Sequence, residues 1–128
     1  MSLSKSEREL VRKKYDGKCA YCGEPLPPKW HADHLEPVQR IEKFVQGIGF
    51  VKTADMEHPE RDCLSNMMPA CPPCNIDKHV MKLDDWRQKL QNACAVLSRG
   101  NPTYRHAKRF GLLNETQLKV IFYFEKNL

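Results

Sequence analysis

The sequence predicts an α+β fold, and three patterns carry that prediction. Two short segments, residues 30–35 and 66–70, have the composition of strands. Several longer segments place apolar residues at helical spacing. Two Cys-x-x-Cys pairs of identical spacing stand before the first of these strands and at the start of a predicted helix. The expected order at the centre of the chain is therefore strand, strand, helix.

The first expected element is a helix that Ser4 and Glu7 open as a capping box and that Gly17 ends. Downstream of the first strand, Pro37 suits a helix start, whereas the glycines at 47 and 49 stop a helix. The remaining expected elements are helices over residues 38–45, 75–82, 84–97 and 104–110, and a strand over 118–124 for which a helix is the alternative.

Length and composition bound the protein class. The 128 residues suit a single domain, with a core at about 19–82 and a C-terminal helical extension at about 83–128. The first residues have no apolar leader, and no apolar run approaches the ~20 residues of a membrane span. A soluble protein of the reducing cytoplasm, without a membrane partner, is expected. A net charge of +5 and a pI near 8.9 favour a polyanionic partner.

Four of the six cysteines have the spacing of metal ligands. Tetrahedral zinc takes two thiolates from each Cys-x-x-Cys pair, and four thiolates leave no open position for a substrate. Two such pairs in one small chain argue against a redox disulfide. The expected structural zinc ligands are Cys19, Cys22, Cys71 and Cys74, whereas Cys63 and Cys94 are read as small buried apolar side chains.

A second pattern surrounds these cysteines. The segment from His31 to Pro37, then Asn66, then the segment from Cys71 to Lys78 resembles the HNH motif of the His-Me finger nucleases. The resemblance covers roughly residues 19–82. In zinc-bearing members of that family, one Cys-x-x-Cys precedes an Asp-His strand and another, followed by Asn, opens the helix. The long stretch between His34 and Asn66 departs from the compact family pattern.

The resemblance implies a ββα-metal core that hydrolyses DNA phosphodiesters to 5′-phosphate and 3′-hydroxyl ends, as the family does. Short free-standing chains of this kind resemble nucleases encoded by phages or mobile elements. The residue types also make chemical sense by themselves. Imidazole is largely neutral near physiological pH, so His34 can act as the general base. Asp33 and Asn75 offer oxygen ligands for one catalytic Mg²⁺ or Mn²⁺. By resemblance, Asn66 ties down the loop that carries the histidine and does not touch the substrate.

Three further residues stay open. His79 follows Asn75 by four positions, so on a helix both can meet one ion, and the alternative is a surface histidine. Lys78 can contact a phosphate or be solvated. His31 shares a strand face with Asp33 and is interpreted as a bystander in preference to a supporting group.

Basic residues outside the motif are candidate phosphate contacts. Arg105, Lys108 and Arg109 crowd near Tyr104 and Phe110, and ordinary solvated faces are the alternative. The expected enzyme is thus an HNH endonuclease with DNA as its partner and with zinc and Mg²⁺ or Mn²⁺ as its metals. The rival hypothesis is a non-catalytic zinc module that binds nucleic acid. The sequence predicts no oligomeric state.

Overall fold

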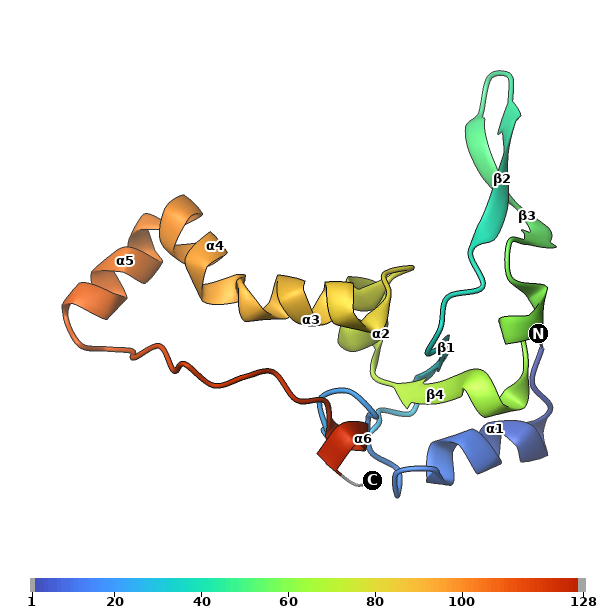
Figure 1. Cartoon of the computed structure of the whole chain (residues 1–128), viewed down its shortest axis with the longest axis horizontal. Coiled ribbons are helices and arrows are strands. Elements are labelled where there is room, and N and C mark those ends of the chain that lie inside the picture. Colours follow the sequence, from blue (N-terminus) through green and yellow to red (C-terminus); the bar gives the residue numbers. More distant parts are fainter. Residues whose placement is uncertain (1, 127–128) are drawn as a thin grey trace. The chain divides into compact units, whose positions relative to one another are not determined.

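The computed structural model describes residues 2–126 and has the predicted α+β class, with helices and two small antiparallel sheets (Figure 1). The helices are α1 (Lys5–Lys13), α2 (Pro72–Lys78), α3 (Leu83–Gln91), α4 (Ala93–Gly100), α5 (Pro102–Arg109) and α6 (Tyr123–Lys126), with single-turn 3-10 helices η1 (Pro59–Arg61) and η2 (Leu64–Asn66). The strands are β1 (His31–His34), β2 (Arg40–Val45), β3 (Gly49–Met56) and β4 (Met67–Ala70). Among the described residues, no helix is long and apolar enough to cross a membrane.

The chain forms two compact units. The first runs up to Leu83 and includes the segment from Phe122 onward, and the second is Asp84–Ile121. The boundary after Leu83 lies next to the predicted end of the core at residue 82. All four metal-spaced cysteines and the whole HNH-like segment lie in the first unit, so this unit holds the candidate site.

The centre of the first unit is the predicted strand, strand, helix order. β1 pairs antiparallel with β4, with His31 opposite Ala70 and His34 opposite Met67, and α2 follows directly. Each of the four β4 residues is buried. A core of Val11, Trp30 and Met67, with Leu3, Leu26, Ala32 and Leu64 packed around it, joins α1 to this sheet.

The predicted capping box begins α1. The Glu7 backbone N–H donates to the Ser4 hydroxyl at 3.2 Å, and the Ser4 N–H donates to the Glu7 carboxylate at 3.0 Å. Arg8 lies 4.1 Å above the Trp30 ring and donates to the Trp30 carbonyl at 2.7 Å. Helix α1 is therefore anchored to the chain segment that enters β1.

Near the end of the described chain, residues pack against the first cysteine pair. The Phe122 and Phe124 rings lie 5.8 and 6.2 Å from the Tyr21 ring, and the Phe124 N–H donates to the Ala20 carbonyl at 2.8 Å. The predicted strand over 118–124 is wrong. Residues 118–122 have no regular structure, and α6 follows at Tyr123.

The predicted helix over 38–45 is also wrong, because this segment contains β2, which forms a hairpin with β3. Phe44 lies opposite Phe50, and Val45 opposite Gly49, with Gly47 and Gly49 at φ 85° and 100° in the turn. A helix over these residues would be stabilised mainly by packing of its apolar face against the rest of the protein. Phe44 lacks such packing, since it is 63% exposed. Alternation within 49–56 supplies a pairing partner, so the β-branched and aromatic residues form strands.

Two helix boundaries also differ from prediction. Helix α2 begins at Pro72 and ends at Lys78, before the predicted end at 82. His79 has φ 51° and ψ −130°, so it stands outside the helix. The predicted helix over 84–97 is divided at Asn92 into α3 and α4.

Within the second unit, side chains form the hydrogen bonds that a neighbouring strand would otherwise make to residues 118–120. The Gln91 side-chain amide donates to the Leu118 carbonyl at 2.9 Å and accepts from the Val120 N–H at 2.8 Å. Arg87 donates to the Val120 carbonyl at 2.8 Å. These bonds satisfy the extended backbone, which explains why an alternating sequence is not a strand here.

Candidate functional site

The four metal-spaced cysteines meet in one cluster. Their Sγ atoms all lie within 4.8 Å of one another, and the Cys22 and Cys71 sulfurs are 3.8 Å apart. A tetrahedral ion with bonds of about 2.3 Å places its sulfurs about 3.8 Å apart. The cluster therefore has the donor set and the size of a closed four-thiolate zinc site. A metal there would join the turn before β1 to the start of α2.

Electrostatics within the cluster favour one thiolate over its neighbours. A hydrogen bond from Cys74 lowers the pKa of Cys19 to about 4. The same hydrogen bond raises the pKa of Cys74 above its ordinary value, and burial raises that of Cys22 to about 11. One negative charge in a half-buried space thus disfavours a second, unless a cation is present to hold the sulfurs together.

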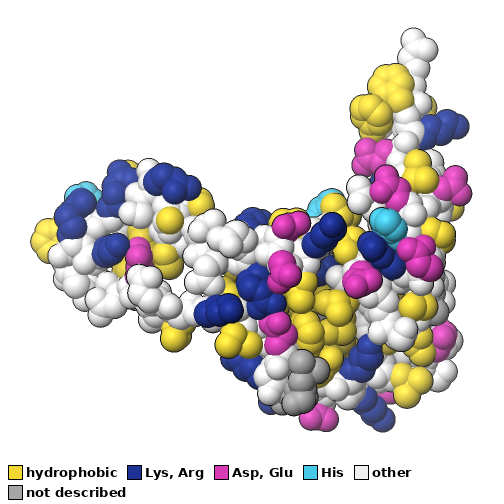
Figure 2. All heavy atoms as spheres, in the orientation of Figure 1, with side chains coloured by type: hydrophobic (Ala, Val, Ile, Leu, Met, Phe, Trp, Pro, Cys, Tyr) yellow, Lys and Arg dark blue, Asp and Glu magenta, His cyan; other side chains and the backbone are white. Residues whose placement is uncertain are grey.

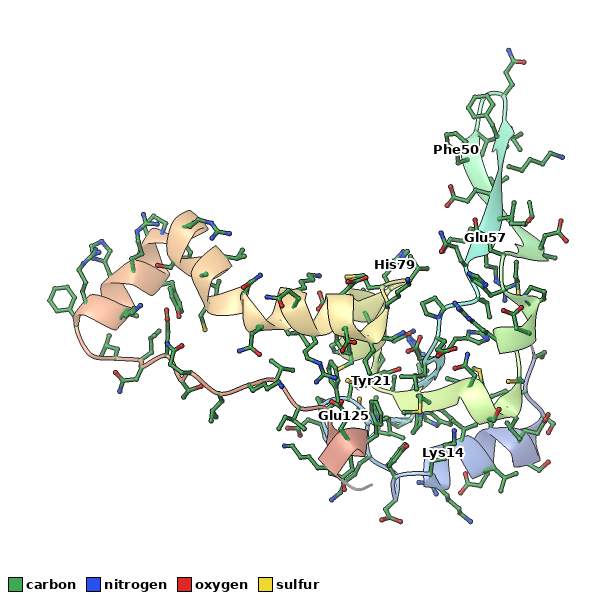
Figure 3. All side chains as sticks on the ribbon, viewed as in Figure 1. Lys14, Tyr21, Phe50, Glu57, His79 and Glu125 are labelled. Atoms are coloured by element: carbon green, nitrogen blue, oxygen red, sulfur yellow. The ribbon has the colours of Figure 1, made fainter. Side chains whose placement is uncertain are left out.

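A cleft of about 630 Å³ lies beside the end of β1. Figure 3 labels two of its lining residues, Glu57 after β3 and His79 after α2. Asp33 and His34 line it together, although neighbours on a strand normally point to opposite faces. Strand β1 ends at His34, so the alternation of a regular strand does not continue past this residue.

His34 is held by a carboxylate that the sequence interpretation missed. Its Nε2 lies 2.9 Å from Oδ1 of Asp62, and both side chains are largely buried. Asp62 lies 28 residues along the chain, in the segment whose structure was predicted least well. The hairpin brings it back, because the His58 N–H donates to the Val38 carbonyl at 3.0 Å and closes the excursion. No motif spacing marks Asp62, so only the fold identifies it.

Asp33 belongs to a buried polar network. The Tyr21 hydroxyl donates to its Oδ2 at 2.6 Å, and the Lys78 ammonium lies 3.1 Å from the same oxygen. Burial and the nearby Asp33 carboxylate raise the pKa of Tyr21, which keeps the phenol protonated as a donor. Both contacts use Oδ2, so Oδ1 is the oxygen that can serve a cation.

The predicted phosphate contact of Lys78 is wrong. Lys78 is fully buried, and its ammonium also donates to the His34 carbonyl at 3.0 Å. A buried charge of this kind is held by its partners and is not available to a ligand. Its contacts fix the end of β1 to the end of α2, and so position Asp33 and His34.

Asn66 makes loop contacts of the kind that the family resemblance implies. Its Oδ1 accepts from the Glu36 N–H at 3.0 Å, and its Nδ2 donates to the carbonyls of Glu36 and Arg61 at 2.9 and 2.8 Å. The Leu35 N–H donates to the Asn66 carbonyl at 2.9 Å. These bonds fasten the chain that leaves His34 to the chain that carries Asp62.

The two other predicted catalytic-metal ligands, Asn75 and His79, have different surroundings. Asn75 has its Nδ2 2.8 Å from Nδ1 of His31 and is not among the described residues that line the cleft. His31 is thus a partner of Asn75, where the sequence favoured a bystander. His79 lines the cleft as the C-cap of α2, and its N–H donates to the Asn75 carbonyl at 3.0 Å. Its φ and ψ are not helical, so the shared helix face expected for the two side chains does not follow from this geometry.

The predicted basic contacts of the second unit divide into two kinds. Arg105 donates to the carbonyls of Ser98 and Arg99 at 2.7 and 3.0 Å, and so caps the end of α4. Lys108 and Arg109 are exposed, although Lys108 pairs with Glu115 at 3.1 Å. Cys94, predicted to be buried, is exposed.

Comparison of this chain with known protein families, with curated proteins and with solved structures finds no match.

Proposed function

We propose that this protein is a metal-dependent DNA endonuclease of the HNH type, with a ββα-metal core formed by β1, β4 and α2. The observation that carries the proposal is the single cleft lined by Asp33 and His34. A cation ligand and a general base are the two groups that phosphodiester hydrolysis requires side by side. The four-cysteine cluster supports the zinc-bearing subtype, because a metal there would join the turn before β1 to the start of α2.

His34 is the proposed general base. With Nε2 bonded to Asp62, Nδ1 is the nitrogen that accepts the proton of the attacking water. Asp62 and Asn66 are positioning residues, since they hold the imidazole and its loop and need not touch the substrate. A general base of this kind contributes about 10² to 10⁴ in rate.

The residues of the cleft fit a hard divalent cation in part. Oδ1 of Asp33 would hold Mg²⁺ or Mn²⁺, with His79 as a second candidate ligand. Among the described residues, the cysteines are the only set of three or more ligand side chains within contact distance of one another, so water and phosphate would complete the shell. When bound, the ion would offset negative charge on the phosphate and on the leaving oxygen. Asn75 would need to exchange its bond to His31 before it could take part.

One observation favours a second candidate function, a non-catalytic zinc module that binds nucleic acid. Lys78 and Tyr21 already satisfy Asp33, as they would if its role were purely structural. Removing Asp33 alone would not separate the two functions, because it would leave the Lys78 charge buried without a partner, which costs about 3 to 5 kcal/mol.

A double variant separates them. Asp33→Leu with Lys78→Met replaces the buried pair by apolar groups of similar size, a change that is often neutral for stability. The zinc-loaded wild type should convert supercoiled plasmid to nicked circles with Mg²⁺ or Mn²⁺, and the double variant should keep its zinc and a cooperative unfolding transition but lose this activity. Its melting temperature should fall modestly, because the Tyr21 hydroxyl and the His34 carbonyl lose these partners. Plasmid binding by a wild type that nicks with neither ion would support the second function instead.

A further inference from the structure

The hairpin of β2 and β3 contributes little to the core of the first unit. None of the described residues 40–56 is buried, and the two strands contact each other far more than any other element (Figure 1). An isolated two-stranded hairpin is at best marginally stable in water. A hairpin retained in this form is better explained by a surface that it presents than by packing.

The hairpin presents aromatic side chains near its turn. Phe44 is 63% exposed and Phe50 71%, and their rings lie 5.4 Å apart in an edge arrangement. Ile48 in the turn is 74% exposed. Figure 2 shows apolar atoms gathered at this end of the hairpin, and Figure 3 labels Phe50 there.

The aromatic pair shares a strand face with two residues that line the candidate active-site cleft. Glu42 and Lys52 are opposite each other across the strands, and both line the cleft. Phe44 and Phe50 are the next opposite pair on the same face, since side chains alternate along a strand. Two residues of strand span about 7 Å. This distance is close to the spacing of successive phosphates along a nucleic acid strand, about 6 to 7 Å.

We infer that Phe44 and Phe50 bind the bases of a DNA strand whose backbone lies in the cleft, while Lys52 and Arg40 contact its phosphates. The inference rests on the proposed function, because that function places the phosphate in the cleft. Basic side chains beside exposed aromatic rings are the combination that binds nucleic acid strands, with phosphates paired to cations and bases stacked on rings. Residues 40–56 carry Arg40, Lys43 and Lys52 against Glu42 and Asp55, an excess of one positive charge.

The test measures binding and not cleavage. Zinc-loaded protein without Mg²⁺ or Mn²⁺ is titrated into a short fluorescein-labelled DNA, and the Kd is obtained from anisotropy at several salt concentrations. Two double variants are compared. The first combines Phe44→Ala with Phe50→Ala. The second combines Phe44→Ile with Phe50→Ile, and it keeps strand propensity but removes the rings. Leu10→Ala is the matched control, because Leu10 is 62% exposed on α1.

Both paired variants should weaken binding about 10- to 100-fold with an unchanged salt slope, as expected for lost stacking. Lys52→Ala should reduce the salt slope by about one phosphate contact. Leu10→Ala should match the wild type. A 2-aminopurine base in the labelled strand should change its fluorescence with the wild type and not with the paired variants.

An unchanged Kd for the folded isoleucine pair would overturn the inference, as would a wild type that does not bind DNA. Loss of self-association in sedimentation, with DNA binding unaffected, would assign the aromatic pair to a contact between copies of this chain. The proposed function can fail separately. Metal-dependent nicking could be absent while the Phe44 and Phe50 variants still lose DNA affinity, and nicking could persist while their affinity is unchanged.

Discussion

At the scale of single residues, the candidate site depends on the hydrogen bond between His34 and Asp62. A carboxylate that accepts from one imidazole nitrogen fixes the tautomer and leaves the other nitrogen as the proton acceptor. The 2.9 Å separation of Nε2 and Oδ1 places the donated proton on Nε2. The geometry therefore assigns a role to Asp62 that depends on charge as well as on shape.

Asp62→Asn tests this role, because it keeps the size of the side chain and removes its charge. The asparagine amide can donate to Nε2, which favours the proton on Nδ1 and removes the acceptor from the cleft. We expect kcat of plasmid nicking to fall by about 10² or more, with KM nearly unchanged. Nitrogen-15 NMR of His34 should report the change of tautomer. An unchanged tautomer together with normal kcat would show that Asp62 is merely a neighbour.

His79 carries backbone strain at the rim of the cleft. Its φ of 51° and ψ of −130° lie where a side chain is disfavoured and glycine is not. His79→Gly should therefore stabilise the protein by about 1 kcal/mol in denaturant unfolding. If His79 is a metal ligand, the same change should raise the Mn²⁺ concentration needed for half-maximal nicking. Greater stability with unchanged metal dependence would make the strain a feature of the fold alone.

At the scale of elements, the cysteine cluster brings together the turn before β1 and the start of α2. Metal binding at this cluster also depends on the protons that its thiols carry. The thiols of Cys22 and Cys74 have pKa values above their ordinary ones, so both are protonated at neutral pH without metal. Zinc binds thiolates, and each of these groups must release its proton on binding. Zinc affinity should therefore rise with pH and be lost on acidification.

Calorimetric zinc titrations in two buffers of different ionisation enthalpy measure this release. At least two protons should leave per zinc near neutral pH, one each from Cys22 and Cys74. A variant with Cys63→Ser and Cys94→Ser serves as the control, because neither sulfur belongs to the cluster, and it should behave like the wild type. Zinc affinity that does not change with pH would contradict the assignment of these thiols.

The elements that the sequence predicts correctly have local causes. The capping box of α1, the two cysteine pairs and the segments of β1 and β4 each follow from neighbouring residues, and β1 and β4 then pair in one antiparallel sheet. The Asn66 contacts were predicted through the family resemblance, and the bonds to the loop after His34 agree with them.

The errors have non-local causes. Spacing of apolar residues in 38–45 is compatible with a helix, and pairing with 49–56 decides otherwise. In the same way, Gln91 satisfies the extended backbone near Val120 without a neighbouring strand. Burial of Lys78 and the contact of Asp62 with His34 join segments 28 or more residues apart. Such contacts leave no mark on sequence spacing.

At the scale of the whole molecule, the net charge of +5 predicts salt-dependent binding to a polyanion. The structure divides the predicted basic contacts of the second unit by their partners. Arg105 caps α4 through two carbonyls, while Lys108 and Arg109 are exposed on α5. The first is expected to stabilise the unit, and the other two remain candidate phosphate contacts.

Lys108→Ala with Arg109→Ala should reduce the slope of log Kd against log salt by about two contacts, with little change in melting temperature. Arg105→Ala should instead lower the melting temperature, because it exposes the carbonyl end of α4. Anisotropy titrations and thermal unfolding on the same preparations compare them. A salt slope unchanged in the double variant would remove α5 from the DNA-binding surface.

The most direct test of the central claim is a plasmid-nicking assay of the wild type beside His34→Ala and His58→Ala, with zinc bound and Mn²⁺ or Mg²⁺ added. His58 is the matched control, because it pairs with Glu60 and does not line the cleft. We expect metal-dependent nicking by the wild type and by His58→Ala, and a loss of about 10² to 10⁴ in His34→Ala with zinc content and melting temperature retained. Nicking by His34→Ala at the wild-type rate, or no nicking by the folded wild type with either ion, would contradict the account.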